Sequence, residues 1–139
     1  MKWILFILIL GSFSFLKSER TSVELKIHGV TELKGNLMIA IYKSADKFPK
    51  FGKGDINVVH KVQTKISSIH ISDLEVGTTY ALAVFHDVNE NKFLDKNFLG
   101  MPEEKYGFSN DARGTFGPPY YREASFTVSN QHKLSVTIR

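Results

Sequence analysis

The sequence predicts an all-β protein: an antiparallel β-sandwich of about seven strands, transthyretin-like or immunoglobulin-like, with one long ordered loop. Three observations support this prediction. Apolar and polar residues alternate with a period of two along most of the chain, and the 3.6-residue period of an amphipathic helix is almost absent. Short clusters of turn residues separate the alternating segments. One segment, residues 87–121, shows neither pattern and is far longer than the usual connection of about 4 to 6 residues.

Seven segments are expected to form the strands: residues 22–30, 35–42, 57–64, 65–71, 78–86, 123–128 and 133–139. In the first of them, Val23, Leu25 and Ile27 share one face and polar residues share the other, which indicates a half-buried strand. Segments 35–42 and 78–86 carry apolar residues on both faces. Both are therefore expected in the interior of a sheet.

Polar segments are expected to connect these strands. Residues 44–55 contain one Pro and two Gly and are predicted to form a loop, with a helical turn after Ser44 as one option. Residues 73–77, which end in Gly, are predicted to form a turn that leads into the strand at 78–86.

The first 16 residues, MKWILFILILGSFSFL, place one Lys before an apolar block with small residues near its end. This layout is typical of a secretory signal peptide, predicted here as residues 1–18, followed by a single β-sandwich domain at residues 19–139. The block is short and interrupted for a membrane-spanning helix, which needs about 20 apolar residues; an uncleaved anchor is the alternative. After cleavage no stable membrane span is expected. We therefore expect an exported protein that is periplasmic, on the cell surface or secreted.

Composition narrows the class of protein further. The chain has no Cys, so it can form no disulfide and cannot carry a lipid-modified Cys, which fits a bacterial export compartment. The formal net charge is +4, and the Lys and Arg residues are scattered without a basic block. A solvated surface of mixed charge is therefore favoured over nucleic-acid binding.

The long segment at 87–121 contains seven of the chain's seventeen aromatic residues. Disordered segments are poor in aromatic residues, so we expect an ordered loop that packs on itself at one end of the sandwich. Long ordered loops are commonly functional. We therefore expect this loop to form the functional surface of the domain.

The start of this loop, HDVNENKFLD, has the spacing of a calcium-binding loop. Five oxygen donors fall at alternate positions: Asp87, Asn89, Asn91, the Phe93 carbonyl and Asp95. The match departs at Lys92, where a calcium loop needs Gly for a sharp turn, and at Phe98, where it needs a bidentate Glu. An EF-hand is excluded, and a looser Ca²⁺ site with a dissociation constant of about 10⁻⁴ to 10⁻³ M is one interpretation. The other is a series of Asx-turns without an ion.

His86 precedes Asp87 at the end of a predicted strand, which suggests acid–base chemistry. Adjacent residues of a strand point to opposite faces, so the two side chains are not expected to meet. The chain contains no GxSxG motif and no zinc-type spacing of His residues. A non-enzymatic binding or structural module with a protein or carbohydrate partner is the favoured function. The alternative is a hydrolase or carbohydrate-active enzyme in which His86 works with one of the loop carboxylates Asp87, Asp95 or Glu104.

Three stretches, LEVGTTYALAVFHD, HDVNENKFLD and FLGMPEEKYGFSNDARGTFGPPYYREASFTV, follow the pattern GxYAxxxxHDxNxNxxxD, GxPxExYGFSN and GPPxxxxAxF. In these stretches the chain resembles the bacterial family known as domain of unknown function 2141. It departs at Lys92, where members tend to have Gly. The resemblance implies an exported, transthyretin-like or carboxypeptidase-regulatory-like domain and no established activity. The loop residues taken as candidates for the functional surface are His86, Glu104, Tyr106, Phe108, Ser109 and Asn110.

Overall fold

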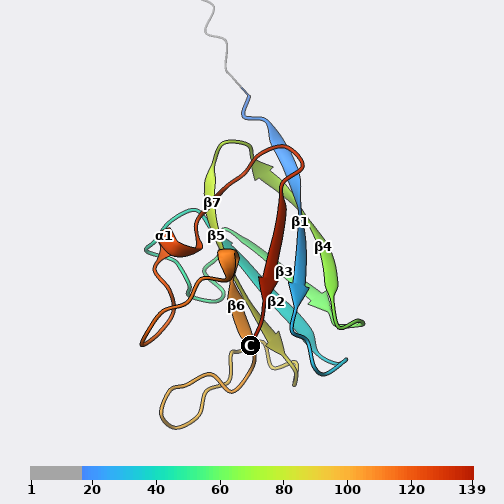
Figure 1. The fold of residues 1–139 in the computed structure, drawn as a ribbon, viewed down its shortest axis with the longest axis vertical. Helices are drawn as coiled ribbons and strands as arrows, with labels where there is room; N and C mark the ends of the chain where they lie inside the picture. Colours follow the sequence, from blue (N-terminus) through green and yellow to red (C-terminus); the bar gives the residue numbers. More distant parts are fainter. Residues whose placement is uncertain (1–16) are drawn as a thin grey trace, which may run out of the picture.

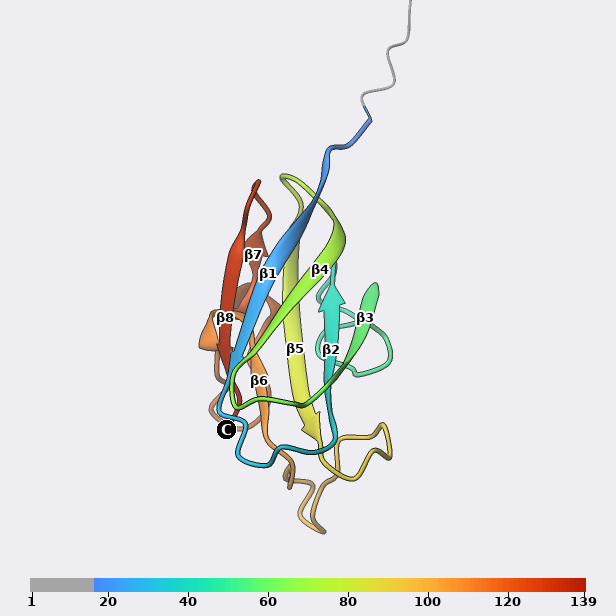
Figure 2. The same ribbon diagram turned by 90° about the vertical axis from the view of Figure 1, so that its right-hand side faces the viewer.

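The computed structural model describes residues 17–139. The first 16 residues, and with them most of the predicted signal peptide, lie outside the described part. Residues 17–139 form eight strands in two sheets that face each other (Figure 2). The prediction of an all-β sandwich is confirmed, with eight strands in place of about seven.

The smaller sheet has three strands in the order β4-β1-β8. They are β1 (Arg20–His28), β4 (Ser67–Glu75) and β8 (Lys133–Thr137). β1 pairs antiparallel with β4 and parallel with β8, so one pair of this mainly antiparallel sandwich is parallel. The first and last strands of the described chain therefore lie side by side (Figure 1).

The larger sheet has five strands, four of them in the order β3-β2-β5-β6. They are β2 (Asn36–Tyr42), β3 (Ile56–Lys61), β5 (Thr79–Asp87) and β6 (Tyr106–Phe108). The fifth, β7 (Phe126–Thr127), pairs with the beginning of β5, whereas β6 pairs with its second half. β5 thus has three partner strands.

The main core fills the space between the two sheets. Alternate residues of β1 and β4 meet alternate residues of β2 and β5, and these buried side chains include Val23, Leu25, Ile27, Leu37, Ile39, Ile41, Ile69, Ile71, Leu82 and Val84. Burying one such side chain contributes about 1.5 to 3 kcal/mol. The period-two alternation of the sequence is the direct expression of this packing.

The other face of the larger sheet is also covered. Ala40 and Tyr42 of β2 and Ala81 and Ala83 of β5 belong to a second buried cluster. Phe48, from the connection between β2 and β3, packs on it with its ring centroid 5.4 Å from that of Tyr42. This explains why β2 and β5 are apolar on both faces, as expected for interior strands.

The predicted turn at residues 73–77 is wrong in position. β4 continues through the buried Leu74, and the chain turns only after Glu75. Asp73 has a φ of 72°, and the pairing of β1 with β4 shifts register there. The turn-forming residue Asp73 belongs to a β-bulge within β4, and this is why the sequence predicted a turn there.

The 87–121 segment, predicted to contain no convincing strand or long helix, contains the short strand β6 and a 3-10 turn, η1 (Ser109–Asp111). The predicted strand at 123–128 is reduced to β7, because its first residues belong to the short helix α1 (Tyr121–Ala124). The cause is local: Glu123 Oε2 accepts a hydrogen bond from the Tyr120 N–H at 2.8 Å, which closes the first turn.

The connection between β2 and β3, residues 43–55, is a chain of turns fixed at both ends by one carboxylate. Asp55 accepts hydrogen bonds from the Lys43 N–H at 2.8 Å and from Lys47 Nζ at 2.7 Å. These bonds hold the connection against the outer face of the larger sheet, where Phe48 and Phe51 pack.

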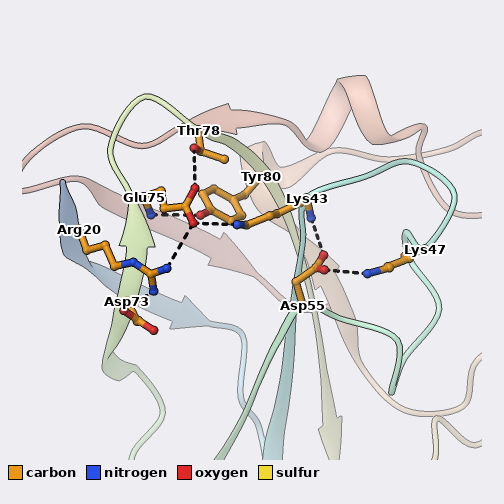
Figure 3. A network of polar contacts seen from close by, with 8 residues as sticks. All are labelled: Arg20, Lys43, Lys47, Asp55, Asp73, Glu75, Thr78 and Tyr80. Atoms are coloured by element: carbon orange, nitrogen blue, oxygen red, sulfur yellow. Dashed lines mark hydrogen bonds and ion pairs between the residues drawn. The ribbon is translucent and has the colours of Figure 1, made fainter. Parts of the chain in front are cut away.

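A polar network joins the two sheets near the start of β1 (Figure 3). Glu75 accepts hydrogen bonds from Lys43 Nζ at 3.0 Å and from Arg20 Nη2 at 3.4 Å. The Glu75 N–H donates to the Tyr80 hydroxyl at 3.1 Å, and Arg20 also pairs with Asp73 at 2.6 Å. The hydrogen bond from Lys43 is the main cause that lowers the pKa of Glu75.

Because of this network, the free energy of unfolding should depend on pH in the acidic range. The folded-state pKa of Glu75 lies below its ordinary value of 4.5, so the carboxylate stabilises the fold above pH 4.5. That contribution is lost as the pH falls through the folded-state pKa. We expect Glu75→Gln to lower the free energy of unfolding at neutral pH and to weaken its dependence on pH below 4.5, measured by urea unfolding.

The matched control is Glu103→Gln. Glu103 is exposed and forms no ion pair within residues 17–139. The Glu103→Gln variant should have the same free energy of unfolding as the wild type at neutral pH and the same dependence on pH below 4.5. Identical pH profiles for the two variants would contradict the assignment.

Candidate functional site

The Asp87 side chain lies at the point where β5 ends and the long loop begins. It is fully buried. Its two carboxylate oxygens accept hydrogen bonds from the main-chain N–H groups of Asn91, at 3.1 Å, and Lys92, at 2.8 Å. A buried carboxylate needs such partners, so Asp87 folds the start of the loop back over the end of β5.

The remaining predicted calcium ligands contact one another. The Asn89 amide donates to Asp95 Oδ2 at 2.7 Å, and the Asn91 amide donates to both Asp95 oxygens, at 2.9 and 3.1 Å. The amide oxygens of Asn89 and Asn91 accept the N–H groups of Asn91 and Phe93, which makes two successive Asx-turns. The Asx-turn interpretation therefore describes the observed geometry, in which amide N–H groups, and not oxygens, face Asp95.

Lys92 adopts the conformation that the sequence left in doubt. Its φ is 68°, in the left-handed region that Gly normally occupies at this position of a calcium loop. The sharp turn is thus formed without Gly. The driving interaction is the hydrogen bond from the Lys92 N–H to the buried carboxylate of Asp87.

Glu104 binds the two ends of this turn together. Its Oε1 accepts the Val88 N–H at 3.0 Å, and its Oε2 accepts the Asp95 N–H at 3.2 Å. The Glu103 N–H also donates to the Asp95 carbonyl at 2.8 Å. Glu104, a predicted functional residue, therefore holds the loop closed.

His86 is buried, with 1% of its surface exposed. Its Nε2 lies 2.8 Å from the carbonyl oxygen of Lys34, so the ring is held by the main chain of the connection between β1 and β2. It borders a polar hollow of about 370 Å³ whose carboxylates include Glu32, Asp95 and Glu104. Within residues 17–139, no group of three or more His, Cys, Asp or Glu side chains is placed to hold a metal ion.

Ser109 and Asn110 fasten the later part of the loop at η1. The buried Ser109 hydroxyl accepts the Leu82 N–H of β5 at 2.9 Å and also contacts the Ala124 carbonyl of α1. The Asn110 amide donates to the carbonyls of Glu123 and Ser125, at 3.1 and 2.8 Å. Both predicted functional residues thus join η1 and α1 to the sheet.

Tyr106 and Phe108 of β6 line an apolar cavity of about 450 Å³ on the outer face of the larger sheet. Its other lining residues come from the β2–β3 connection and from the long loop: Pro49, Lys50, Phe51, Leu94, Lys96, Gly100, Pro102, Gly117 and Pro118. We call this cavity the Phe51 groove. Of the predicted functional residues, these two are the ones that border it.

The loop does not pack on itself as predicted. Tyr106, Phe108 and Tyr121 belong to the second cluster, but six large apolar side chains of the loop are mostly exposed: Phe93, Phe98, Leu99, Met101, Phe116 and Tyr120. Phe98, for example, is 95% exposed. The polar bonds described above shape the loop, so these side chains are not needed to hold it.

Sequence reasoning missed the contribution of the β2–β3 connection to this site. The connection contributes Pro49, Lys50 and Phe51, which are far from the long loop in sequence. The alternation of apolar and polar residues assigned them only to a polar connection. The available signal was the pair of Phe residues in KFPKFGKG, which is unusual in a polar connection.

The left-handed conformation of Lys92 should cost stability. We expect Lys92→Gly to raise the free energy of unfolding by about 0.5 to 1 kcal/mol, because relief of the left-handed strain exceeds the added entropy of the unfolded chain. Lys96→Gly is the control, since Lys96 lies in the same loop without a positive φ and should lose stability. Urea unfolding measures both, and a destabilised Lys92→Gly variant would contradict the prediction.

Calcium binding by the Asp/Asn loop stays a prediction. With the expected affinity, about 10 mM Ca²⁺ should raise the free energy of unfolding by about 1.4 to 2.7 kcal/mol. Asp95→Ala should abolish the rise. Asn97→Ala should keep it, because Asn97 forms a separate Asx-turn with the Leu99 N–H at 3.0 Å. No rise in the wild type, or an equal rise in both variants, would overturn the prediction.

In the part of the chain that the structure describes, no helix has the length and apolar character needed to span a membrane.

The family model of DUF2141, described as "Uncharacterized protein conserved in bacteria", matches residues 25–136, a range that runs from β1 to β8 and includes the whole long loop. No curated protein and no solved structure matches the chain. The match covers most of the sequence and confirms the resemblance, so the chain belongs to the DUF2141 family.

Proposed function

We propose that the protein is an exported, non-enzymatic binding domain. Its binding surface is the Phe51 groove, formed jointly by the 87–121 loop and the β2–β3 connection. The observation that carries the proposal is the apolar cavity of about 450 Å³ between these segments. Its size falls within the range of small-molecule sites, about 300 to 1,000 Å³, and its lining is mainly apolar as in such sites.

The exposed apolar side chains of the loop support a binding role as well, at positions that do not line the groove. Of the nine large apolar residues that are mostly exposed within residues 17–139, six lie on this loop. Large apolar side chains gathered on one exposed segment are typical of interaction sites. A protein or carbohydrate partner is the sequence-based prediction; the apolar groove favours a ligand less polar than a sugar, whose hydroxyls need polar partners.

The enzymatic alternative is weaker because its central residue is not presented to a substrate. His86 is buried, and its Nε2 is held by the Lys34 carbonyl. The neighbouring carboxylates of Asp87 and Glu104 each accept two main-chain N–H groups. Groups engaged in this way support the fold of the loop.

Export rests on the layout of residues 1–18. Cell fractionation with mass spectrometry is the test. We expect the protein outside the cytoplasm, with its N-terminus near residue 19. A full-length protein that stays with the membrane would favour the anchor alternative.

The groove should bind an uncharged apolar probe. We expect Nile red to bind the folded protein saturably, with one site and a blue-shifted emission. Leu94→Ala should weaken this binding, because Leu94 lines the groove. The Leu99→Ala variant should not, because the Leu99 side chain is 70% exposed and does not line it.

These two variants remove the same atoms from the same loop, so their difference reports the groove alone. Thermal unfolding of both variants checks that each remains folded. Absence of saturable binding, or equal weakening by the two substitutions, would contradict the proposal that the groove is the binding surface.

A further inference from the structure

A second cavity adjoins the Phe51 groove at Phe51. It has a volume of about 150 Å³ and is lined by residues of β2, β3 and β5 that include Met38, Val59 and Phe85. The Phe51 ring stands edge-on to that of Phe85, with the ring centroids 4.6 Å apart. Both cavities are mainly apolar and share Phe51, and the two together are called the Phe51 depression.

The charged residues that line the two cavities are all Lys. Lys50 and Lys96 line the groove, Lys92 lines the second cavity, and neither lining contains an Asp or Glu. None of the three Lys residues forms an ion pair with any residue in 17–139. Lys50 Nζ donates to the main-chain oxygen of Asp46 at 3.0 Å, a partner without formal charge.

From this combination we infer that the depression binds an anionic amphiphile, namely the carboxylate of a single-chain fatty acid. The inference rests on the proposed function and specifies its ligand. The acyl chain lies along the apolar floor on either side of Phe51, and the carboxylate meets the ammonium groups of the groove. A Lys side chain suits this role because its charge sits at the end of a flexible four-carbon stem that reaches over an apolar surface.

Shape and charge together favour this ligand over other apolar ones. An apolar site divided between two adjoining cavities accommodates one flexible chain more readily than a compact ring system. A neutral apolar ligand would use the floor but would not pair with the three ammonium groups. A cationic amphiphile would meet repulsion from all of them.

The test compares three ligands with the same ten-carbon chain by isothermal titration calorimetry, on the folded mature protein and below micelle-forming concentrations. Decanoate should bind, decan-1-ol should bind more weakly, and decyltrimethylammonium should bind weakest. The double variant Lys50→Gln/Lys96→Gln should weaken decanoate by about fivefold and leave decan-1-ol within about twofold. The control Lys26→Gln removes an exposed charge on β1, in the other sheet, and should change neither.

The outcomes separate this inference from the proposed function. Nile red binding with no preference for decanoate over decan-1-ol, or a preference that survives the double variant, would overturn the fatty-acid inference and keep the binding groove. Absence of binding by Nile red and by all three ligands would overturn both. A decanoate preference lost in the double variant and kept in Lys26→Gln supports the inference.

Discussion

β5 is buried on both faces, and this double burial constrains where the other elements lie. Every residue from Tyr80 to Asp87 is buried, and β5 pairs with β2, β6 and β7. One face of the strand joins the main core, and the other joins the second cluster. A strand in this position requires a layer on each side, which is why the β2–β3 connection and α1 lie over the outer face of the larger sheet (Figure 1).

The same constraint shapes the loop that follows. Because β5 ends in a buried carboxylate, the next residues must supply hydrogen-bond donors, and the main chain of Asn91 and Lys92 does so. Glu104 then closes the turn, and Ser109 returns the chain to β5. Polar bonds hold the loop at its start and again at η1. Its apolar side chains are therefore available for contacts with other molecules.

The periodic strands could be predicted from the sequence because their faces differ in burial. β1 and β8 show this clearly, and β2 and β5 were identified as interior strands by their two apolar faces. β6 could not be found in this way, since three residues carry no period and form a strand only because β5 offers a partner. The bulge at Asp73 and the cap at Glu123 depend on local bonds that alternation does not reveal.

The candidate site was predictable in part. The Asp and Asn spacing located the start of the loop and the residues that do contact one another there. The groove was not predictable, because Phe51 comes from a connection that Asp55 and Lys47 fix in place and reaches Tyr106 only in the folded chain. Lys92 shows the converse case, in which a buried carboxylate imposes a turn that the residue type disfavours.

The parallel pairing of β1 with β8 has a consequence for how the domain assembles. The smaller sheet cannot be completed until the last strand is available, because Leu25 pairs with Leu134 and Ile27 with Val136 across nearly the whole domain. Such a closure has a high contact order and forms late. During synthesis from the N-terminus, the chain therefore lacks this closing contact until β8 has left the ribosome, and one edge of β1 stays unpaired until then.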